Sequence, residues 1–238
     1  MTNKIAIMQP YVFPYLGYMH LVNASSKFVF YDDVNFIVSG WINRNRIMLM
    51  GEPHLFSIPL KQPSQNILIK DTQVSVLSKF TNKFHKQLAS SYKNAPYKNI
   101  VLDYVSDVLK DSHKSISELA IESIKLFFQY VGLEKKFHLS SQEFSSTRGL
   151  EKAERLIKIM QLLDSNEYIN LMGGTSLYEK DFFASKGIML NFVKSSFMPY
   201  AQCNRGDGVF NPGLSIIDIM MNLSEHDIRT HLDSYQLV

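Results

Sequence analysis

The chain has 238 residues, of which 45% are hydrophobic and 20% charged, so it is long enough to bury one large core. Its formal net charge is +3 and basic residues are interleaved with acidic ones, which gives little reason to expect binding to nucleic acid or to a membrane surface. No segment approaches the ~20 apolar residues of a membrane-spanning helix, and no signal-peptide pattern precedes Gln9. We therefore expect one continuous soluble domain in the cytoplasm.

Cys203 is the single cysteine, so no disulfide forms within the chain, and no spaced set of Cys and His residues predicts a zinc site. This composition favours a reducing compartment. The thiol of Cys203 could accept an acyl group as a thioester, but no histidine close to it in the sequence would activate it. We expect neither a bound metal ion nor a cofactor.

The first 33 residues predict a strand, a short helix and a second strand. Ile5–Met8 is a continuous apolar run typical of a buried strand, Tyr18–Ala24 fits a short helix, and Phe28–Tyr31 fits the next strand. Such a unit is a right-handed parallel crossover, and ligands of parallel sheets bind at the carboxyl ends of the strands. The polar residues that follow the two strands should lie at that edge: Gln9, Asp32 and Asp33.

The rest of the chain predicts an α/β fold with a Rossmann-like, mostly parallel sheet and two additions. Residues 34–60 form a strand-rich excursion with a turn at Gly51–Pro53, and residues 72–131 form a helical block whose apolar positions recur at four-residue spacing from Val76. The sequence predicts three further strands, at Lys136–Leu139, Tyr168–Met172 and Ile188–Val193. It predicts four late helices, one with an apolar face from Ala153 to Leu163 and three more at Leu177–Ala184, Ser215–Asn222 and Glu225–Leu232.

Asp32 and Asp33 could bind a divalent cation, act as a general base or hold sugar hydroxyls, and Asp33 is the candidate general base. Adjacent strand residues point to opposite faces, so Asp32 and Asp33 converge on one ligand only if the strand has already ended. The alternative is that the pair caps a loop. His20 is a second candidate base, although a lone histidine on a short helix is more often structural.

Aromatic side chains crowd the turn after the first strand. Tyr11, Tyr15 and Tyr18 stand there with Gln9 and two prolines, and they would stack on a base or a sugar. The alternative is that the three rings belong to the core. Asp32 joins this set as a residue that holds sugar hydroxyls.

Three further features suggest phosphate binding. Arg44 and Arg46 are two residues apart, so in a strand they share one face and could hold a diphosphate, unless that face is simply solvated. Ser145 and Thr147 precede a predicted helix, whose exposed amides attract anions. Gly173 and Gly174 open another predicted helix. They would allow a phosphate to approach the backbone closely, unless the pair is simply a turn.

The chain resembles the WbqC-like protein family. The resemblance rests on MQPYVFPYLGYMHLVNA at the N-terminus, FVFYDDVNFI and GWINRNRI after it, Pro199–Gln202, Phe210, Pro212 and LSIIDIMMN, and it spans nearly the whole chain. That family is associated with bacterial O-antigen and other surface-polysaccharide (lipopolysaccharide) biosynthesis. The resemblance implies work on sugar precursors, such as the addition of an acyl or aminoacyl group to a nucleotide-linked amino sugar.

A more distant resemblance concerns the fold. Tyr15-Leu16-Gly17-Tyr18 stands where the nucleotidylyltransferase superfamily carries His-x-Gly-His, and Ser145–Arg148 is similar to the Ser-Ser-Thr element of those enzymes. Both histidines are tyrosines here, and a neutral phenol is a poor substitute for a cationic donor to phosphate. We therefore predict a related fold without nucleotidyl transfer.

Taken with the first resemblance, these features predict an acyltransferase or aminoacyltransferase. It would move the acyl group from a carrier thioester, held by an acyl carrier protein, to the amine of a nucleotide-linked deoxyamino sugar. Asp33 or His20 would take the proton. Phosphate would be held by Arg44, Arg46, Ser145 and Thr147. Two alternatives are a non-catalytic accessory protein that binds the nucleotide sugar and a nucleic-acid-binding module, for which the charges give little reason.

Overall fold

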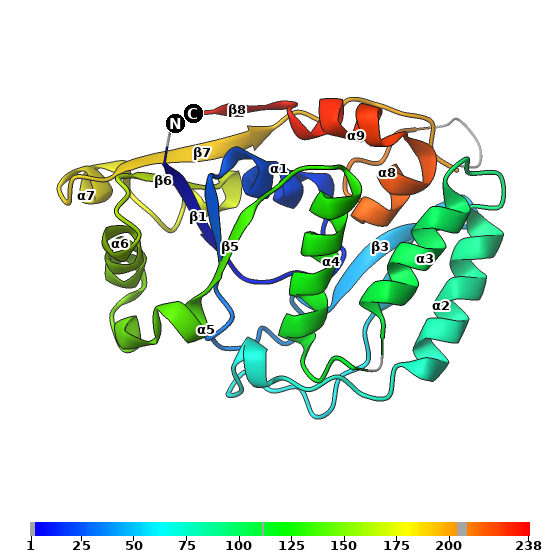
Figure 1. Cartoon of the computed structure of the whole chain (residues 1–238), viewed down its shortest axis with the longest axis horizontal. Helices are drawn as coiled ribbons and strands as arrows, with labels where there is room; N and C mark the ends of the chain where they lie inside the picture. Colours follow the sequence, from blue (N-terminus) through cyan, green and yellow to red (C-terminus); the bar gives the residue numbers. More distant parts are fainter. Residues whose placement is uncertain (1–2, 111, 204–208) are drawn as a thin grey trace.

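The computed structural model describes residues 3–110, 112–203 and 209–238, and a mostly parallel sheet is at its centre (Figure 1). The strand order is β5-β2-β1-β6-β7-β8, and all neighbours are parallel except β7 and β8. The strands are β1 (Lys4–Met8), β2 (Lys27–Phe30), β5 (Lys136–Leu139), β6 (Glu167–Leu171), β7 (Met189–Ser195) and β8 (Tyr235–Leu237). This arrangement confirms the α/β fold with a Rossmann-like sheet.

The predicted crossover at the N-terminus is confirmed. Helix α1 (Leu16–Ala24) connects β1 to its parallel neighbour β2. Met8 is in register with Phe30, and Phe30 is in register with Leu139 of β5. The chain therefore leaves three adjacent strands at the same level of the carboxyl edge, which brings the segments after Met8, Phe30 and Leu139 together.

The two faces of the sheet are both covered, and this explains why β1 is apolar throughout. Ile5 and Ile7 pack in one hydrophobic cluster with residues of α6 (Lys152–Leu162) and α7 (Lys180–Ala184). Ala6 between them packs in the other cluster with residues of α1 and α4 (Ile116–Tyr130). Successive side chains of a strand point to opposite faces, so burial of both faces requires a continuous apolar run. The two helical layers are visible on either side of the sheet in Figure 1.

Three long helices make the predicted helical block. They are α2 (Ser78–Ser91), α3 (Lys98–Val108) and α4 (Ile116–Tyr130). Ser115 and Glu118 form a reciprocal capping box at the start of α4, and Gly132, at φ +67°, follows its end. The expected apolar pattern was wrong at Val76, which precedes α2 and is exposed, because Leu77 takes the buried position there.

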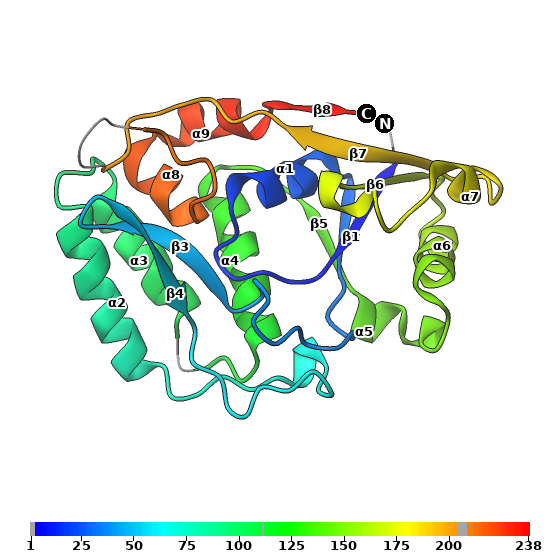
Figure 2. The same cartoon turned by 180° about the vertical axis from the view of Figure 1, so that it is seen from behind.

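The excursion contains a separate antiparallel hairpin, β3 (Arg44–Leu49) and β4 (Glu52–Ser57). Its turn is at Met50–Gly51, both at positive φ, so Glu52 and Pro53 belong to the strand and not to the turn as expected. The hairpin lies against α2 (Figure 2). The rings of Phe56 on β4 and Phe84 on α2 are 4.7 Å apart.

The C-terminal half departs from expectation in two places. The helix expected at Leu177–Ala184 is only α7 (Lys180–Ala184), because residues 175–179 form a turn and irregular backbone after the 3-10 turn at Met172–Gly174. Strand β8 was not predicted. The remaining helices are α5 (Ser140–Glu143), α6 (Lys152–Leu162), α8 (Ile216–Asn222) and α9 (Glu225–Leu232), and a 3-10 turn also occupies Ile69–Asp71. Within the described ranges, no helix is both long and apolar enough to cross a membrane.

Candidate functional site at the carboxyl edge of the sheet

The strand order places a topological switch point between β1 and β6. The chain moves from β1 towards β2 and β5 on one side, and later occupies β6 and β7 on the other. Open parallel sheets bind ligands in the crevice outside the carboxyl ends of the strands at this point. Gln9 follows β1 there, and Met172–Gly174 follow β6.

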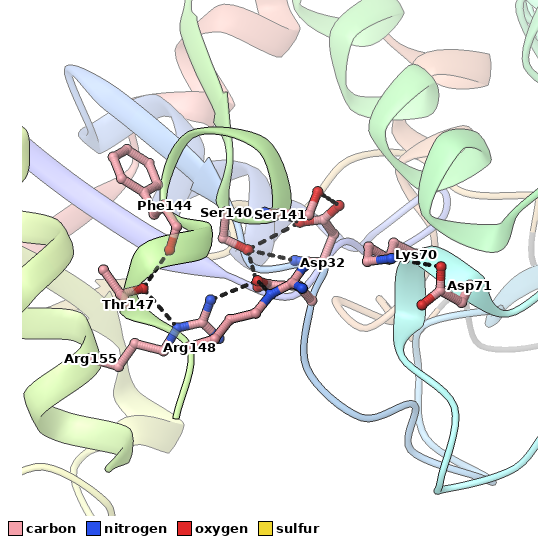
Figure 3. A network of polar contacts seen from close by, with 10 residues as sticks. Asp32, Lys70, Asp71, Ser140, Ser141, Phe144, Thr147, Arg148 and Arg155 are labelled. Atoms are coloured by element: carbon pink, nitrogen blue, oxygen red, sulfur yellow. Dashed lines mark hydrogen bonds and ion pairs between the residues drawn. The ribbon is translucent and has the colours of Figure 1, made fainter. Parts of the chain in front are cut away.

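A buried ion-pair network lies beside this point, after β2 and β5 (Figure 3). One oxygen of the Asp33 carboxylate accepts hydrogen bonds from Nε of Arg148 at 2.8 Å and from a terminal nitrogen of Arg155 at 2.7 Å. The other accepts from the hydroxyl of Ser140 at 2.5 Å. The side chain of Asp33 is fully buried, whereas that of Arg148 is 44% exposed. Asp33 therefore anchors one buried and one exposed guanidinium.

These contacts set the charge of Asp33. Burial alone would raise the pKa of its carboxyl, but the hydrogen bonds from Ser140, Arg148 and Arg155 outweigh burial and lower the pKa below its usual range. A carboxylate with a lowered pKa is a weak base. The geometry thus gives Asp33 a direct part in holding the arginines, and its predicted role as general base stays a prediction that these contacts do not favour.

Asp32 and Asp33 do converge, because β2 ends at Phe30. Ser140 Oγ lies 3.0 Å from the Asp32 carboxylate as well as 2.5 Å from that of Asp33. Asp32 is further held by the backbone N–H and the hydroxyl of Ser141, at 3.0 and 2.7 Å. Both carboxylates are buried among hydrogen-bond donors, so the pair holds this edge together, and the expected contact of Asp32 with sugar hydroxyls stays a prediction.

Ser145 and Thr147 do not cap a helix, which corrects the expectation. They lie in a separate 3-10 turn, and α6 begins only at Lys152 with Glu151 at its N-cap position. The buried hydroxyl of Thr147 donates to the carbonyl of Phe144 and accepts from Nε of Arg155 at 3.0 Å. Thr147 therefore orients Arg155, and Ser145 is exposed.

The turn after β1 is held rigidly by side chains from distant segments. Phe13 has a φ of 43°, a left-handed conformation that costs a non-glycine residue stability. Its N–H donates to Ser123 Oγ at 3.1 Å, and its carbonyl accepts from Asn45 at 2.6 Å and from Ser215 at 2.8 Å. These three bonds fix the strained residue and with it the rings on either side.

The three tyrosines of the turn have different roles. Tyr18 is buried, and its hydroxyl donates to the carbonyl of Gln9 at 2.8 Å, so it supports the turn from below and was wrongly expected to face a ligand. Tyr11 and Tyr15 are only partly buried, with ring centroids 6.5 Å apart. The ring of Tyr15 lies over Gly17, where any Cβ would clash with it.

Arg44 and Arg46 share one face of β3, as expected. Both guanidinium groups lie over the ring of Trp41, at 5.5 and 5.2 Å from its centroid. Neither forms an ion pair with a residue that the structure describes. Arg44 also donates to the carbonyl of Ser39, while its buried Nε has no hydrogen-bond partner in the described part of the chain.

Tyr11 connects this cationic pair to the turn. Burial is the main cause that raises the pKa of the Tyr11 hydroxyl above its ordinary value, Tyr15 adds to it, and the positive charges of Arg46 and Arg44 oppose both. Tyr11 therefore stays neutral at physiological pH. The result is a partly open cluster of rings and cations, formed by Tyr11, Tyr15, Trp41, Arg44 and Arg46, which we call the Arg–Trp cluster.

His20 is not placed to act as a base near Asp33. It is fully buried, its Nε2 donates to the carbonyl of His231 at 2.9 Å, and its ring stacks on Phe197. Burial lowers its pKa, so the ring is neutral. Its described contacts lie in the C-terminal part of the chain, which makes it a core histidine.

The remaining candidates are distributed over the carboxyl edge and the C-terminal segment. Gly173 and Gly174 follow β6 at the switch point, and a Cβ at Gly174 would press against the buried amide of Asn170. Cys203 lies near Asn222, and burial raises the pKa of its thiol, which disfavours a thiolate nucleophile.

A second buried carboxylate was missed entirely. Asp218 is fully buried in the first turn of α8 and accepts from the hydroxyls of Tyr92 and Tyr200, both at 2.7 Å, and from Gln202 at 2.9 Å. Burial raises its pKa above the ordinary value although the three donors oppose this. Asp218 ties the segment around Tyr200 to the helical block.

Sequence reasoning also missed five residues of the candidate site, namely Ser140, Ser141, Arg148 and Arg155 at the edge and Trp41 beside Arg44 and Arg46. A signal existed for the serines, because they follow a predicted strand directly, as the aspartates do. Arg155 gave no such signal, since it looked like one more charged residue of an amphipathic helix.

The match to known proteins covers almost the whole chain. Residues 9–230 match the WbqC-like protein family. The chain belongs to that family. A relative from Mycobacterium tuberculosis (strain ATCC 25618 / H37Rv), the uncharacterized protein Rv1507c, is 24% identical to this WbqC-like chain over 224 residues, which are 93% of the chain and 94% of the relative. No solved structure matches the chain, so the resemblance to nucleotidylyltransferases stays a prediction.

Proposed function

We propose that this WbqC-like protein is a transferase of bacterial surface-polysaccharide (O-antigen) biosynthesis, which binds a nucleotide-linked deoxyamino sugar at the carboxyl edge. The observation that carries the proposal is the Arg–Trp cluster. Two guanidinium groups, which form no ion pair in the described part of the chain, lie beside partly open aromatic rings, next to the turn that follows β1. Guanidinium groups suit a diphosphate, and the rings suit a base or a sugar.

The proposed reaction moves an acyl or aminoacyl group from a carrier thioester to the sugar. The amine nitrogen attacks the thioester carbonyl carbon, and the carbon–sulfur bond breaks. The proton lost by the nitrogen ends on the sulfur, which releases the carrier as a thiol. Because the substrate supplies the nucleophile and the leaving group accepts the proton, the protein contributes mainly orientation and hydrogen-bond donors.

The residues divide the work in this proposal. Arg44 and Arg46 hold the diphosphate, and Tyr11 and Tyr15 contact the base or sugar. Asp33 is a positioning residue that aims the exposed Arg148 along the edge, where its terminal nitrogens are available to a carbonyl or phosphate oxygen.

One observation favours the second candidate, a non-catalytic accessory protein that binds the nucleotide sugar. The two predicted bases are both engaged, because Asp33 is paired with arginines and His20 is buried. A protein that only binds its ligand needs no base.

One experiment with two parts separates the two. The purified protein is incubated with a nucleotide-linked amino sugar and an acyl thioester, the mass of the sugar is measured by mass spectrometry, and free thiol is titrated. Binding of the sugar alone is measured by calorimetric titration. Acylated sugar and thiol in equal amounts support the transferase. Binding of the sugar without product supports the accessory protein, and neither binding nor product contradicts both.

A further inference from the structure

A groove of about 620 Å³ lies between α2 and the tip of the β3–β4 hairpin. Its lining includes Leu49 and Met50 from the hairpin and three lysines of α2, which are Lys79, Lys83 and Lys86. The lysines are exposed, and their spacing of four and three residues places them on one helix face, opposite the buried Phe84 and Leu88. We call this surface the lysine groove.

Among the residues that the structure describes, the lining of the lysine groove contains no carboxylate. From Thr72 to Leu102 the sequence contains five lysines and no aspartate or glutamate, so the charges of this stretch are not interleaved as those of the whole chain are. None of the three groove lysines forms an ion pair with a residue that the structure describes. This face of α2 therefore presents a concentrated positive surface.

This arrangement works against the stability of α2. Like charges three and four residues apart repel each other, and Lys79 lies in the first turn, where the helix dipole disfavours a cation. A face built in this way is relieved by negative charge from outside the chain. The repulsion between the lysines of α2 therefore favours the binding of a negatively charged partner.

The residues that line the groove favour an acidic protein helix over a nucleic acid. Met50 is 69% exposed at the hairpin turn, and with Leu49 it adds an apolar wall to the lysines. Nucleic-acid surfaces use arginines and stacking rings, and the groove lining has neither. The three lysines span seven residues, about 10 Å of helix, which matches two turns of an acidic helix with an apolar residue at its centre.

We propose that the lysine groove docks an acidic helix of the carrier protein that delivers the acyl thioester. The acidic character of this partner follows from the groove itself, whereas its role as the thioester carrier rests on the proposed transfer. The groove begins where β3 ends. Arg46 lies three residues before Leu49 on that strand, about 10 Å away at the rise of a strand. A docked carrier thus lies next to the Arg–Trp cluster, within reach of an extended thioester arm.

The test is calorimetric titration of the full chain with a purified acyl carrier protein that lacks its thioester arm, at low and at high salt. We expect salt-sensitive binding, weakened about tenfold or more in the triple variant K79E/K83E/K86E and less in the triple Lys→Gln variant. Met50→Ser should also weaken binding, because charge alone does not fill the groove. The matched control K125E/K136E/K158E carries the same charge change elsewhere and should bind as the wild type does.

Several results would overturn the proposal: no binding of the carrier by the wild-type chain, equal losses in the control triple, or equal binding of single-stranded DNA or anionic vesicles. The transfer proposal is tested apart from it by a small acyl thioester without a carrier. If that thioester is used but no carrier binds, the docking surface is wrong and the transfer stands. If the carrier binds and no thioester is used, the docking surface stands and the transfer proposal is wrong.

Discussion

The Asp33 carboxylate lies 2.7 Å from a terminal nitrogen of Arg155, and both side chains are buried. The same oxygen accepts from Arg148, which reaches the surface. The removal of one partner from a buried ion pair leaves an uncompensated charge, which costs far more than the loss of an exposed pair. This pair therefore links the stability of the fold to the direction in which Arg148 points.

Asp33→Asn should lower the free energy of unfolding by about 3 to 5 kcal/mol, because Arg155 is then buried without a carboxylate. Urea unfolding measures this. The control is Asp71→Asn, which removes an exposed pair with Lys70 and should cost at most about 1 kcal/mol. If Asp33→Asn is as stable as the control, the network does not hold the edge together.

The lowered pKa of Asp33 also predicts a pH dependence. Its contribution to stability is complete above the unfolded pKa of about 3.9, and it is lost as the pH falls through the lower pKa of the folded state. The stability difference between wild type and Asp33→Asn should therefore shrink below about pH 4. A difference that stays constant down to the acid transition would show that Asp33 is not ionised in the fold.

Asp218 should behave in the opposite way. Its folded pKa is raised, so the folded state binds its proton more tightly, and ionisation of the buried carboxyl penalises the fold as the pH rises from about 4 through the folded pKa. Tyr92 and Tyr200 donate to different oxygens of Asp218, so Asp218→Asn keeps an acceptor for one of them and cannot ionise. Its stability relative to wild type should improve over that rise in pH, and urea unfolding at several pH values checks it.

Arg46→Gln should weaken the binding of a nucleotide-linked sugar by about 10- to 100-fold, because one charge-assisted contact contributes roughly 1.5 to 3 kcal/mol. Calorimetric titration measures the change, and Lys158→Gln on α6 is the control for a lost positive charge. Folding should be unaffected, since Arg46 has no ion-pair partner among the described residues. Equal affinities of the two variants would remove Arg46 from the site.

Substitutions of Tyr11 should affect ligand binding, whereas substitution of Tyr18 should affect the stability of the fold. Tyr18→Phe removes the donor to the Gln9 carbonyl and should cost about 1 to 3 kcal/mol of stability. Tyr11→Phe keeps the ring and should be nearly neutral, whereas Tyr11→Ala should weaken ligand binding by about 1 to 3 kcal/mol. Thermal unfolding and titration of the four proteins, wild type included, test this. A neutral Tyr18→Phe would contradict the supporting role.

The parts of the fold that sequence could predict are those set by local pattern. The crossover from β1 through α1 to β2, the face shared by Arg44 and Arg46, and the position of Gln9, Asp32 and Asp33 at one edge all follow from period and strand direction. They were predicted because each depends on neighbours in the chain.

The rest depended on contacts across long separations. Arg155 meets Asp33 across 122 positions, and Tyr92 meets Asp218 across 126, so no local pattern marks either pair. Tyr18 was expected to face a ligand, and only the packing shows that it lies beneath Gln9. His20 was misplaced for the same reason, because its partner His231 is near the other end of the chain.

The most direct test of the account is a calorimetric comparison of the wild-type chain with a nucleotide-linked amino sugar and with the free amino sugar. If the Arg–Trp cluster holds a diphosphate, the nucleotide-linked sugar should bind about 100-fold more tightly or better, because two charge-assisted contacts are at stake. Equal affinities for the two ligands would contradict the claim that the carboxyl edge is a nucleotide-sugar site.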